Sequence, residues 1–436
     1  MKLLTDESNT FVNWVQIYDI DRQYMNQNKQ RDEIAKPLYY ASLAGLTEAS
    51  SFLLEMRADI NAQGGHYGNA LQAASYGGHG AIIKLLIEKG AEINAKKGYF
   101  GNALQAASYK GHEAITKLLI DNRAEVAAQG GYYGNALQAA SYGGHVAITM
   151  LLIEKGADVN TQGGYYGNAL QAASLRRHDA IAKLLIEKGA EVNAQGGHNG
   201  NALQAASLGG QDAIAKLLIE EGANVNAQGG WLGNALQAAS FQGHDAIAML
   251  LIEEGADVNA QRGKFGNALQ AASYKGHEAI INLLIEKGAD VNVQGGHYGN
   301  ALQAASYRGH EAITRLLIEK GADLNAQGGH YGNALQAASR QGHEAIAKLL
   351  IEKGADVNAQ GGDYRNALQA ASYGGHKEIE KLLTDKGADV KAGWEDALQA
   401  TSYEGHKAIA KLLSGKGADV DTSQMHPEQV VIKDME

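Results

Sequence analysis

Gly68-Asn-Ala-Leu-Gln-Ala-Ala-Ser75 is one copy of a motif that returns at a constant interval along this chain of 436 residues. A tenth copy, at residues 365–372, differs only in its first residue, which is Arg. A fixed period of about 33 residues indicates a stacked repeat array rather than several separate globular cores. The nine identical copies begin at Gly68, Gly101, Gly134, Gly167, Gly200, Gly233, Gly266, Gly299 and Gly332.

Related sequences extend the array in both directions. One period before the first copy stands Pro37-Leu-Tyr-Tyr-Ala-Ser42. After the last copy, Ala397-Leu-Gln-Ala-Thr-Ser402 arrives three residues early because the linker at residues 391–396 is shortened. The sequence therefore predicts twelve repeats.

Each repeat predicts two short helices and a turn. Asn69 is a good N-cap, because its side chain can accept a hydrogen bond from a free backbone N–H of the first helical turn. We expect a helix over residues 70–76, ended where Gly78 supplies a left-handed backbone. A second helix is expected over residues 80–89, where apolar residues follow i, i+3, i+4 spacing. The glycines of residues 63–68 predict a hairpin turn.

Three short motifs resemble the ankyrin repeat: Gly-His at residues 78–79, Leu-Leu at residues 85–86, and Gly-Ala-Asp-Val-Asn-Ala at residues 354–359. The ankyrin repeat has the same period as this chain, and the resemblance extends from Pro37 to Asp421. It implies an all-α repeat solenoid of twelve stacked helix-turn-helix units with β-hairpin turns.

The chain departs from the ankyrin pattern in three ways. The Thr-Pro-Leu-His of the family is Asn-Ala-Leu-Gln at residues 69–72, so the rigid Pro is missing except at Pro37. The Asp-x-x-Gly turn of the family is Gly-Gly-x-aromatic here, and we expect looser hairpin tips. Arg177 replaces the Gly that ends the first helix in other repeats, and we expect local strain there.

The flanking segments are expected to differ from the repeats. Residues 1–34 predict a capping helix and a linker, residues 35–421 the repeat array, and residues 422–436 a polar tail that we expect to be disordered. The cap and first repeat are similar to the lead-in of fungal ankyrin arrays, many of which follow a NACHT-type nucleotide-switch domain. That domain is not found in this sequence. The apolar face of the cap would be formed by Phe11, Trp14, Val15 and Tyr18.

Composition argues against several functional classes. A net charge of −10 does not suit a binder of duplex DNA or of anionic membranes. The lack of Cys removes disulfides, thiolate metal sites and cysteine nucleophiles. No apolar run approaches the roughly 20 residues of a membrane helix, and the N-terminus turns polar too early for a signal peptide. We expect an intracellular monomer, cytoplasmic or nuclear and not secreted, without direct contact to nucleic acid or membrane.

No catalytic, cofactor or metal site is predicted, so we expect a protein that is not an enzyme. The Gly-rich loops lack a following Lys-Ser/Thr and are interpreted as turns rather than phosphate cradles. One His per repeat is interpreted as structural, bonding the backbone of the next hairpin. Such His residues are roughly 8–10 Å apart by helix packing, too far to share a zinc ion. The series is His79, His112, His145, His178, His244, His277, His310, His343, His376 and His406.

Residues that vary between repeats lie at the hairpin tips and at the ends of the first helices. The resemblance implies that both sets line a concave groove that grips partner proteins, and Tyr and Trp are typical of binding hot spots. For Tyr67 and its equivalents, partner contact and a stiffening aromatic ladder both stay open. The predicted tip contacts are His66, Tyr99, Tyr132, Tyr165, His198, Trp231, Lys264, His297 and His330. The predicted helix-end contacts are Tyr76, Tyr109, Tyr142, Phe241, Tyr274, Lys275, Tyr307, Arg308, Arg340 and Tyr373.

The basic residues among these suggest a partner segment with acidic and apolar residues, for example in a transcription factor. The alternative is that they only keep the surface soluble. We therefore predict a non-catalytic protein-binding scaffold that acts as a regulatory adaptor, such as a transcription coregulator linked to a fungal secondary-metabolite gene cluster. The alternative is the detached sensor array of a NACHT-type, immune-like switch protein.

Overall fold

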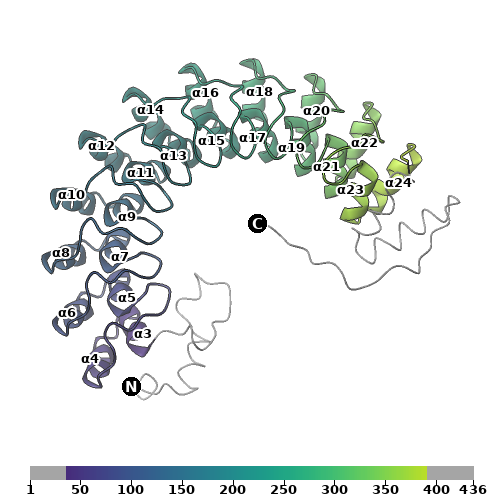
Figure 1. Ribbon diagram of the computed structural model, residues 1–436. Helices are drawn as coiled ribbons and strands as arrows, with labels where there is room; N and C mark the ends of the chain where they lie inside the picture. Colours follow the sequence, from purple (N-terminus) through teal and green to yellow (C-terminus); the bar gives the residue numbers. More distant parts are fainter. Residues whose placement is uncertain (1–35, 390–436) are drawn as a thin grey trace, which may run out of the picture. The chain divides into compact units, whose positions relative to one another are not determined.

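The computed structural model describes residues 36–389, which form 22 helices in eleven consecutive pairs (Figure 1). The predicted capping helix, twelfth repeat and polar tail lie outside the described residues. Over residues 36–389 there is no β-strand, and nine of the hairpins carry a single antiparallel bridge, such as Gly64 with Gly68. The fold is thus an all-α repeat solenoid, as the sequence predicts. Within this span no helix is long and apolar enough to cross a bilayer.

The chain divides into two compact units, Met1–Ala235 and Leu236–Glu436. Each layer of a unit is one helix pair, with a first and a second helix. The pairs of the first unit are α3 (Pro37–Leu43) and α4 (Thr47–Glu55), α5 (Ala70–Gly77) and α6 (Gly80–Glu88), α7 (Ala103–Lys110) and α8 (Glu113–Asp121), α9 (Ala136–Gly143) and α10 (Val146–Glu154), α11 (Ala169–Leu175) and α12 (Asp179–Glu187), and α13 (Ala202–Gly209) and α14 (Asp212–Glu220). Those of the second unit are α15 (Ala235–Gln242) and α16 (Asp245–Glu253), α17 (Ala268–Lys275) and α18 (Glu278–Glu286), α19 (Ala301–Arg308) and α20 (Glu311–Glu319), α21 (Ala334–Gln341) and α22 (Glu344–Glu352), and α23 (Ala367–Gly374) and α24 (Lys377–Asp385).

The first helices begin and end as their sequence predicts. Asn69 has an extended backbone, and its side chain accepts a hydrogen bond of 2.9 Å from the backbone N–H of Gln72. Gly78 ends α5 in the left-handed conformation, with a φ of 82°. In the α11 layer Arg177 takes this place with a φ of 64°, and α11 ends one residue early, at Leu175. The predicted strain at Arg177 is therefore confirmed.

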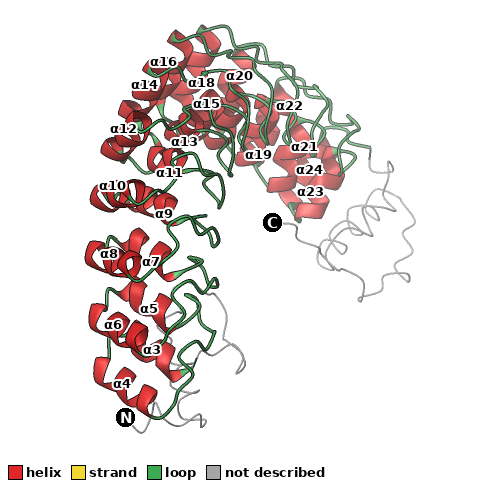
Figure 2. Cartoon of the chain, turned by 60° about the vertical axis from the view of Figure 1, so that its left-hand side comes forward, coloured by secondary structure: helices red, strands yellow, loops and turns green. Residues whose placement is uncertain are grey.

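The first helices form the centre of each unit. Ala73 and Ala74 are fully buried, and such small side chains allow the first helices of neighbouring layers to pack closely. Each second helix buries one face, which in α6 includes Ile82 and Leu86. The second helices of neighbouring layers contact each other less than the first helices do. Within a unit, the second helices lie on one side of the first helices and the hairpin loops on the other (Figure 2).

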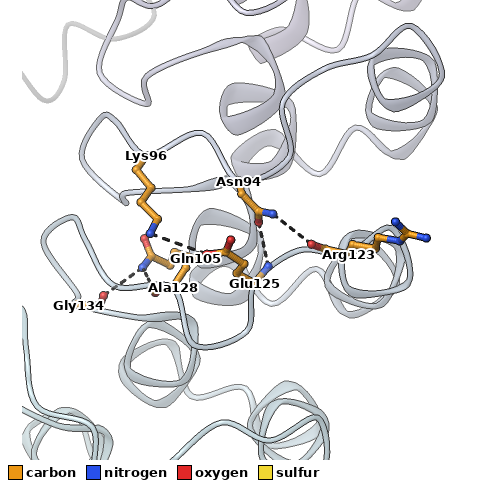
Figure 3. Close-up of polar contacts among 7 residues, drawn as sticks. All are labelled: Asn94, Lys96, Gln105, Arg123, Glu125, Ala128 and Gly134. Carbon is orange, nitrogen blue, oxygen red and sulfur yellow. Dashed lines mark hydrogen bonds and ion pairs between the residues drawn. The ribbon is translucent and has the colours of Figure 1, made fainter.

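In most layers, two side-chain amides form hydrogen bonds to the next layer. Gln105 donates hydrogen bonds of 3.2 and 3.1 Å to the carbonyl oxygens of Ala128 and Gly134 in the following hairpin (Figure 3). Asn94 donates to the carbonyl oxygen of Arg123 and accepts from the backbone N–H of Glu125. Equivalent bonds recur in both units and give partners to backbone N–H and C=O groups of the neighbouring layer.

Within residues 36–389 the His residues of this series are structural, but their predicted partner is wrong; His406 lies outside the described residues. Nε2 of His112 donates to the carbonyl oxygen of Tyr76, 36 residues earlier, and not to the next hairpin. His112 lies between the left-handed Gly111, which ends α7, and Glu113, the first residue of α8, and its ring reaches the preceding layer rather than the next hairpin. A Cβ at Gly78 of that layer would lie 2.7 Å from the His112 ring, so the small residue makes room for the contact.

Candidate functional site

The hairpin loops lie on the side of each unit opposite the second helices (Figure 2). Three rows of residues belong to these hairpins and to the ends of the first helices. We name them the tip row, the inner row and the helix-end row. The tip row is His66, Tyr99, Tyr132, Tyr165, His198 and Trp231 in the first unit, and Lys264, His297, His330 and Asp363 in the second. The inner row is Tyr67, Phe100, Tyr133, Tyr166, Asn199 and Leu232, and then Phe265, Tyr298, Tyr331 and Tyr364. The helix-end row is Tyr76, Tyr109, Tyr142, Leu175 and Leu208, and then Phe241, Tyr274, Tyr307, Arg340 and Tyr373.

The tip row of the first unit is a continuous stack of rings. The centroids of Tyr99 and Tyr132 are 5.0 Å apart with 16° between the ring planes, and Tyr132 and Tyr165 repeat this geometry at 5.0 Å and 15°. His66 extends the stack at one end, and His198 and Trp231 extend it at the other. The six predicted tip contacts of this unit therefore lie side by side.

Backbone hydrogen bonds hold the tips at this spacing. The N–H of Tyr132 donates to the carbonyl oxygen of Tyr99, and the N–H of Tyr165 to that of Tyr132, both at 2.8 Å. The expectation of loose hairpin tips is therefore wrong. Gly131 gives the reason: its φ is 65°, and a Cβ there would lie 2.2 Å from the carbonyl carbon of Phe100. Glycine at this position lets one tip approach the next to hydrogen-bonding distance.

The inner row is part of the core. Tyr67, Phe100 and Tyr133 are each no more than 3% exposed, and the Phe100 and Tyr133 rings stack at 5.6 Å with 8° between their planes. For this row the structure favours the stiffening ladder over direct contact with a partner.

Burial also fixes the protonation of these tyrosines. It raises the pKa of Tyr133 far above the usual value, and a hydrogen bond with the Tyr109 side chain adds to the rise. Burial and the hydrogen bond with Tyr142 raise the pKa of Tyr166 in the same way. Tyr99, in the more accessible tip row, has its pKa raised to about 12, mainly by burial and then by Tyr132. All of these hydroxyls are neutral at physiological pH and act as hydrogen-bonding groups.

The helix-end row carries cations over its rings. Nζ of Lys110 lies 4.8 Å from the Tyr76 centroid, Nζ of Lys275 lies 4.4 Å from that of Phe241, and the Arg308 guanidinium lies 4.9 Å from that of Tyr274. Arg176 covers Tyr142, and Arg340 lies over Tyr364 and Tyr373. Such contacts stabilise by about 0.5–1 kcal/mol at exposed sites. Lys275 and Arg308 remain exposed, so their charge is still open to a partner.

The second unit has a more polar tip row. Lys264 is exposed, and the rings of His297 and His330 stack at 5.1 Å. Nδ1 of His330 lies 2.6 Å from a carboxylate oxygen of Asp363. Burial lowers the pKa of His297, and the neighbouring His330 lowers it further. Asp363 thus ends the described tip row with a carboxylate beside two imidazoles.

The structure places every predicted contact residue in the tip row or the helix-end row, or directly after the latter, as with Lys275 and Arg308. Sequence reasoning missed two features of this surface: the tip-to-tip backbone bonds and the pairing of each cation with a ring. The second had a sequence signal. Each of these cations comes from the layer after the ring it covers, where it directly follows the helix-end residue. The four are Lys110, Arg176, Lys275 and Arg308.

Comparison with known proteins gives three results. A family model described as ankyrin repeats (3 copies) matches in overlapping segments, at residues 7–97, 72–163, 103–196, 169–262, 203–295 and 269–361. A 90-residue segment is 46% identical to the azaphilone pigments biosynthesis cluster protein L of Monascus ruber, covering 18% of this chain and 19% of that protein's length. The crystal structure of the human ASB11 ankyrin repeat domain aligns with a TM-score of 0.42 and 28% identity, over 48% of this chain and 96% of that one.

Proposed function

Because the chain belongs to the ankyrin repeat family, whose members typically serve as protein-interaction modules, we propose that it is a non-catalytic scaffold acting as a regulatory adaptor. The proposal places the partner across the tip row and the helix-end row. We further propose that it works in the cytoplasm or nucleus.

The observation that carries this proposal is the tip row of the first unit. Six aromatic rings lie in one stack, and Tyr165 at its middle is 39% exposed. Aromatic side chains offer large contact areas at low conformational entropy cost, because few rotatable bonds must be fixed. The tip-to-tip hydrogen bonds hold these rings before a partner arrives, which further reduces the entropy lost on binding.

The second unit supports a more specific partner. Lys275 and Arg308 combine exposed charge with aromatic rings beneath them, and Arg340 lies over Tyr373 in the same row. A segment with alternating acidic and apolar residues would match both, with carboxylates at the cations and apolar side chains at the rings. A segment of a transcription factor is one such partner, and a coregulator is the corresponding role.

The relative from Monascus ruber supports a setting in fungal secondary metabolism, since its name assigns it to an azaphilone pigment gene cluster. This chain spans about a fifth of that relative's length, so the role of the whole relative is carried over as a proposal only. Genes next to the locus separate the two candidate roles. Biosynthetic enzymes would favour the coregulator, and an adjacent nucleotide-binding switch domain would favour the detached sensor array.

A pull-down from a native extract tests the proposed function. The full chain is compared with the triple variant Tyr274→Ala, Tyr307→Ala, Tyr373→Ala, and we expect its specific partner to be lost. A matched control replaces three exposed residues of the second helices, Asn282→Ala, Arg315→Ala and Lys348→Ala, and should retain the partner. Equal capture by both variants, with unchanged helical content by circular dichroism, would reject the helix-end row as the docking surface.

A further inference from the structure

Of the aromatic helix-end residues whose next layer is described, four carry a cation of that layer over the ring and two, Tyr109 and Tyr307, do not. For each ring in this row, we call one residue of the next layer its covering position: the residue that directly follows the helix-end residue of that layer. Where this residue is Lys or Arg, its cation lies over the ring, as Lys110 lies over Tyr76. The covering position of Tyr109 is Gly143, which has no side chain. Among helix-end aromatic residues whose covering position lies within residues 36–389, only Tyr109 has glycine there, while Tyr307 has the uncharged Gln341. One face of its ring is thus left without the cation that the chain supplies elsewhere.

The geometry around Tyr109 matches that of rings that carry a cation. Its centroid is 6.3 Å from that of Tyr142, with 20° between the planes. The corresponding distances are 6.5 Å for Phe241 with Tyr274 and 6.4 Å for Tyr274 with Tyr307. These two pairs accommodate Lys275 and Arg308. The Tyr109 layer therefore has the ring spacing that admits a cation, and no rearrangement of the rings is needed.

The Tyr109 ring is also fixed in place. It packs 5.1 Å from the Phe100 ring and 4.9 Å from the Tyr133 ring, and its side chain is hydrogen-bonded to that of Tyr133. The ring face beside Gly143 is therefore held in a fixed position.

We propose that the Tyr109 ring, left open by Gly143 and bordered by Tyr142, receives a Lys or Arg side chain of the bound protein. This inference rests on the proposed scaffold function and adds a basic residue to the description of the partner. The charge would occupy the place that Lys275 and Arg308 occupy over their own rings.

Neighbouring charges permit this occupancy. Lys110 and Arg176 lie over the rings before and after Tyr109 in the row. In the second unit Lys275 and Arg308 cover successive rings, so the row tolerates cations in adjacent layers. The chain as a whole carries a net charge of −10, which favours the approach of a basic group.

A small probe tests the site without the unknown partner. The full chain, with ¹³C-labelled tyrosine rings, is titrated with N-acetyl-arginine amide and followed by NMR, and the Tyr109 signal is assigned by its loss in Tyr109→Phe. We expect saturable shifts of the Tyr109 and Tyr142 ring signals. N-acetyl-citrulline amide has a similar shape without the charge and should shift them far less. Equal shifts from both probes, or no shift at Tyr109, would overturn the proposal.

Two variants and a control connect the binding to the open ring. Gly143→Lys provides the missing cation from the chain itself and should weaken probe binding by about twofold to fivefold, the effect of one exposed cation–π contact. Tyr109→Leu, which copies Leu175 of a nearby layer, should do the same if Gly143→Lys unfolds. Gly77→Lys is the control, because it makes the same change at the end of α5. The residue that its cation would cover in the preceding layer is Leu43, which has no aromatic ring, so probe binding at Tyr109 should stay unchanged.

Binding that persists in folded Gly143→Lys would refute the site. The proposed function is judged separately, by the pull-down. A chain that binds the arginine probe at Tyr109 but retains its partner after helix-end mutation would refute the docking surface and leave the cation site standing.

Discussion

The imidazole Nε2 of His112 lies 3.0 Å from the carbonyl oxygen of Tyr76 in the preceding layer. His145 makes the same bond to Tyr109 at 2.8 Å, so the contact repeats from layer to layer. In one layer of the first unit the His is replaced by Gln211, whose amide nitrogen is 3.4 Å from the carbonyl oxygen of Leu175. The side-chain oxygen of Gln211 is buried and, among the described residues, has no hydrogen-bond partner.

We predict that Gln211→His stabilises the first unit by about 1 kcal/mol, because it shortens one interlayer hydrogen bond and removes a buried unsatisfied oxygen. Urea unfolding followed by circular dichroism measures the change. The reciprocal substitution His112→Gln should cost a similar free energy. A Gln211→His protein that unfolds at the same urea concentration as the wild type would show that the His bond adds nothing to interlayer stability.

The helices and turns of each layer could be predicted because their determinants are local. Asn69 caps its own helix and Gly78 ends it, so a few residues in sequence settle each boundary. The direction of the His112 bond and the stacking of Tyr99 on Tyr132 could not be predicted in the same way. Both depend on how closely one layer approaches the next, and the sequence of a single repeat does not contain that distance. The recurrence of a cation directly after a helix-end residue was visible in the sequence, but it gains meaning only once the layers are stacked.

The Asn series between layers is interrupted at Ala127. In other layers this position accepts a hydrogen bond from a backbone N–H of the next layer, as Asn160 does from Glu191 at 2.8 Å. It also donates to a carbonyl oxygen there, as Asn160 does to Gly189. Asp158 and Gly156 stand at the corresponding places after Ala127. We predict that Ala127→Asn restores both bonds and stabilises the protein by about 0.5–1 kcal/mol, since the site is exposed.

Thermal unfolding checks this substitution, with Ala127→Ser as the control, because Ser is too short to bridge two layers. Asn160→Ala should lower the midpoint by about as much as Ala127→Asn raises it. If Ser and Asn at residue 127 give the same midpoint, the interlayer amide is not the source of the stability.

A buried carboxyl in α24 predicts an unusual pH dependence. Glu380 is 1% exposed, and one of its carboxyl oxygens has no partner within the described residues. Burial raises its pKa, although a hydrogen bond with Ser372 and the charge of Lys377 oppose the rise. The folded state therefore holds the proton more tightly than the unfolded state. This contribution to stability is complete below the unfolded pKa and is lost as the pH rises through the folded pKa.

We predict that Glu380→Gln increases stability relative to the wild type more at pH 7 than at pH 4. Urea unfolding at the two pH values measures the difference, and comparison between the proteins cancels the titration of all other acids. Glu380→Ala, which copies the buried Ala347 of the layer before, should show the same trend. A wild-type advantage that grows toward pH 7 would mean that the carboxylate has a favourable partner when charged.

The stacked tips depend on glycine in two separable ways. Gly131 has a φ of 65°, and a Cβ on it would lie 2.2 Å from the backbone of Phe100. Gly156 has a φ of 90°, and a Cβ there would meet nothing within 4 Å. Both Gly131→Ala and Gly156→Ala therefore carry the cost of a left-handed alanine, roughly 1–2 kcal/mol. Gly131→Ala additionally forces the Tyr99 and Tyr132 tips apart and breaks the 2.8 Å hydrogen bond between their backbones.

We predict that Gly131→Ala destabilises the first unit by at least about 1 kcal/mol more than Gly156→Ala, the difference being the lost tip bond and the displaced backbone. Hydrogen exchange of the Tyr132 amide should speed up in Gly131→Ala and stay as in the wild type in Gly156→Ala. Since the Tyr132 N–H is the donor of the tip bond, its exchange reports that contact directly. If both alanine variants lose the same stability and the Tyr132 amide keeps its protection, the tips are held by ring stacking rather than by close backbone approach.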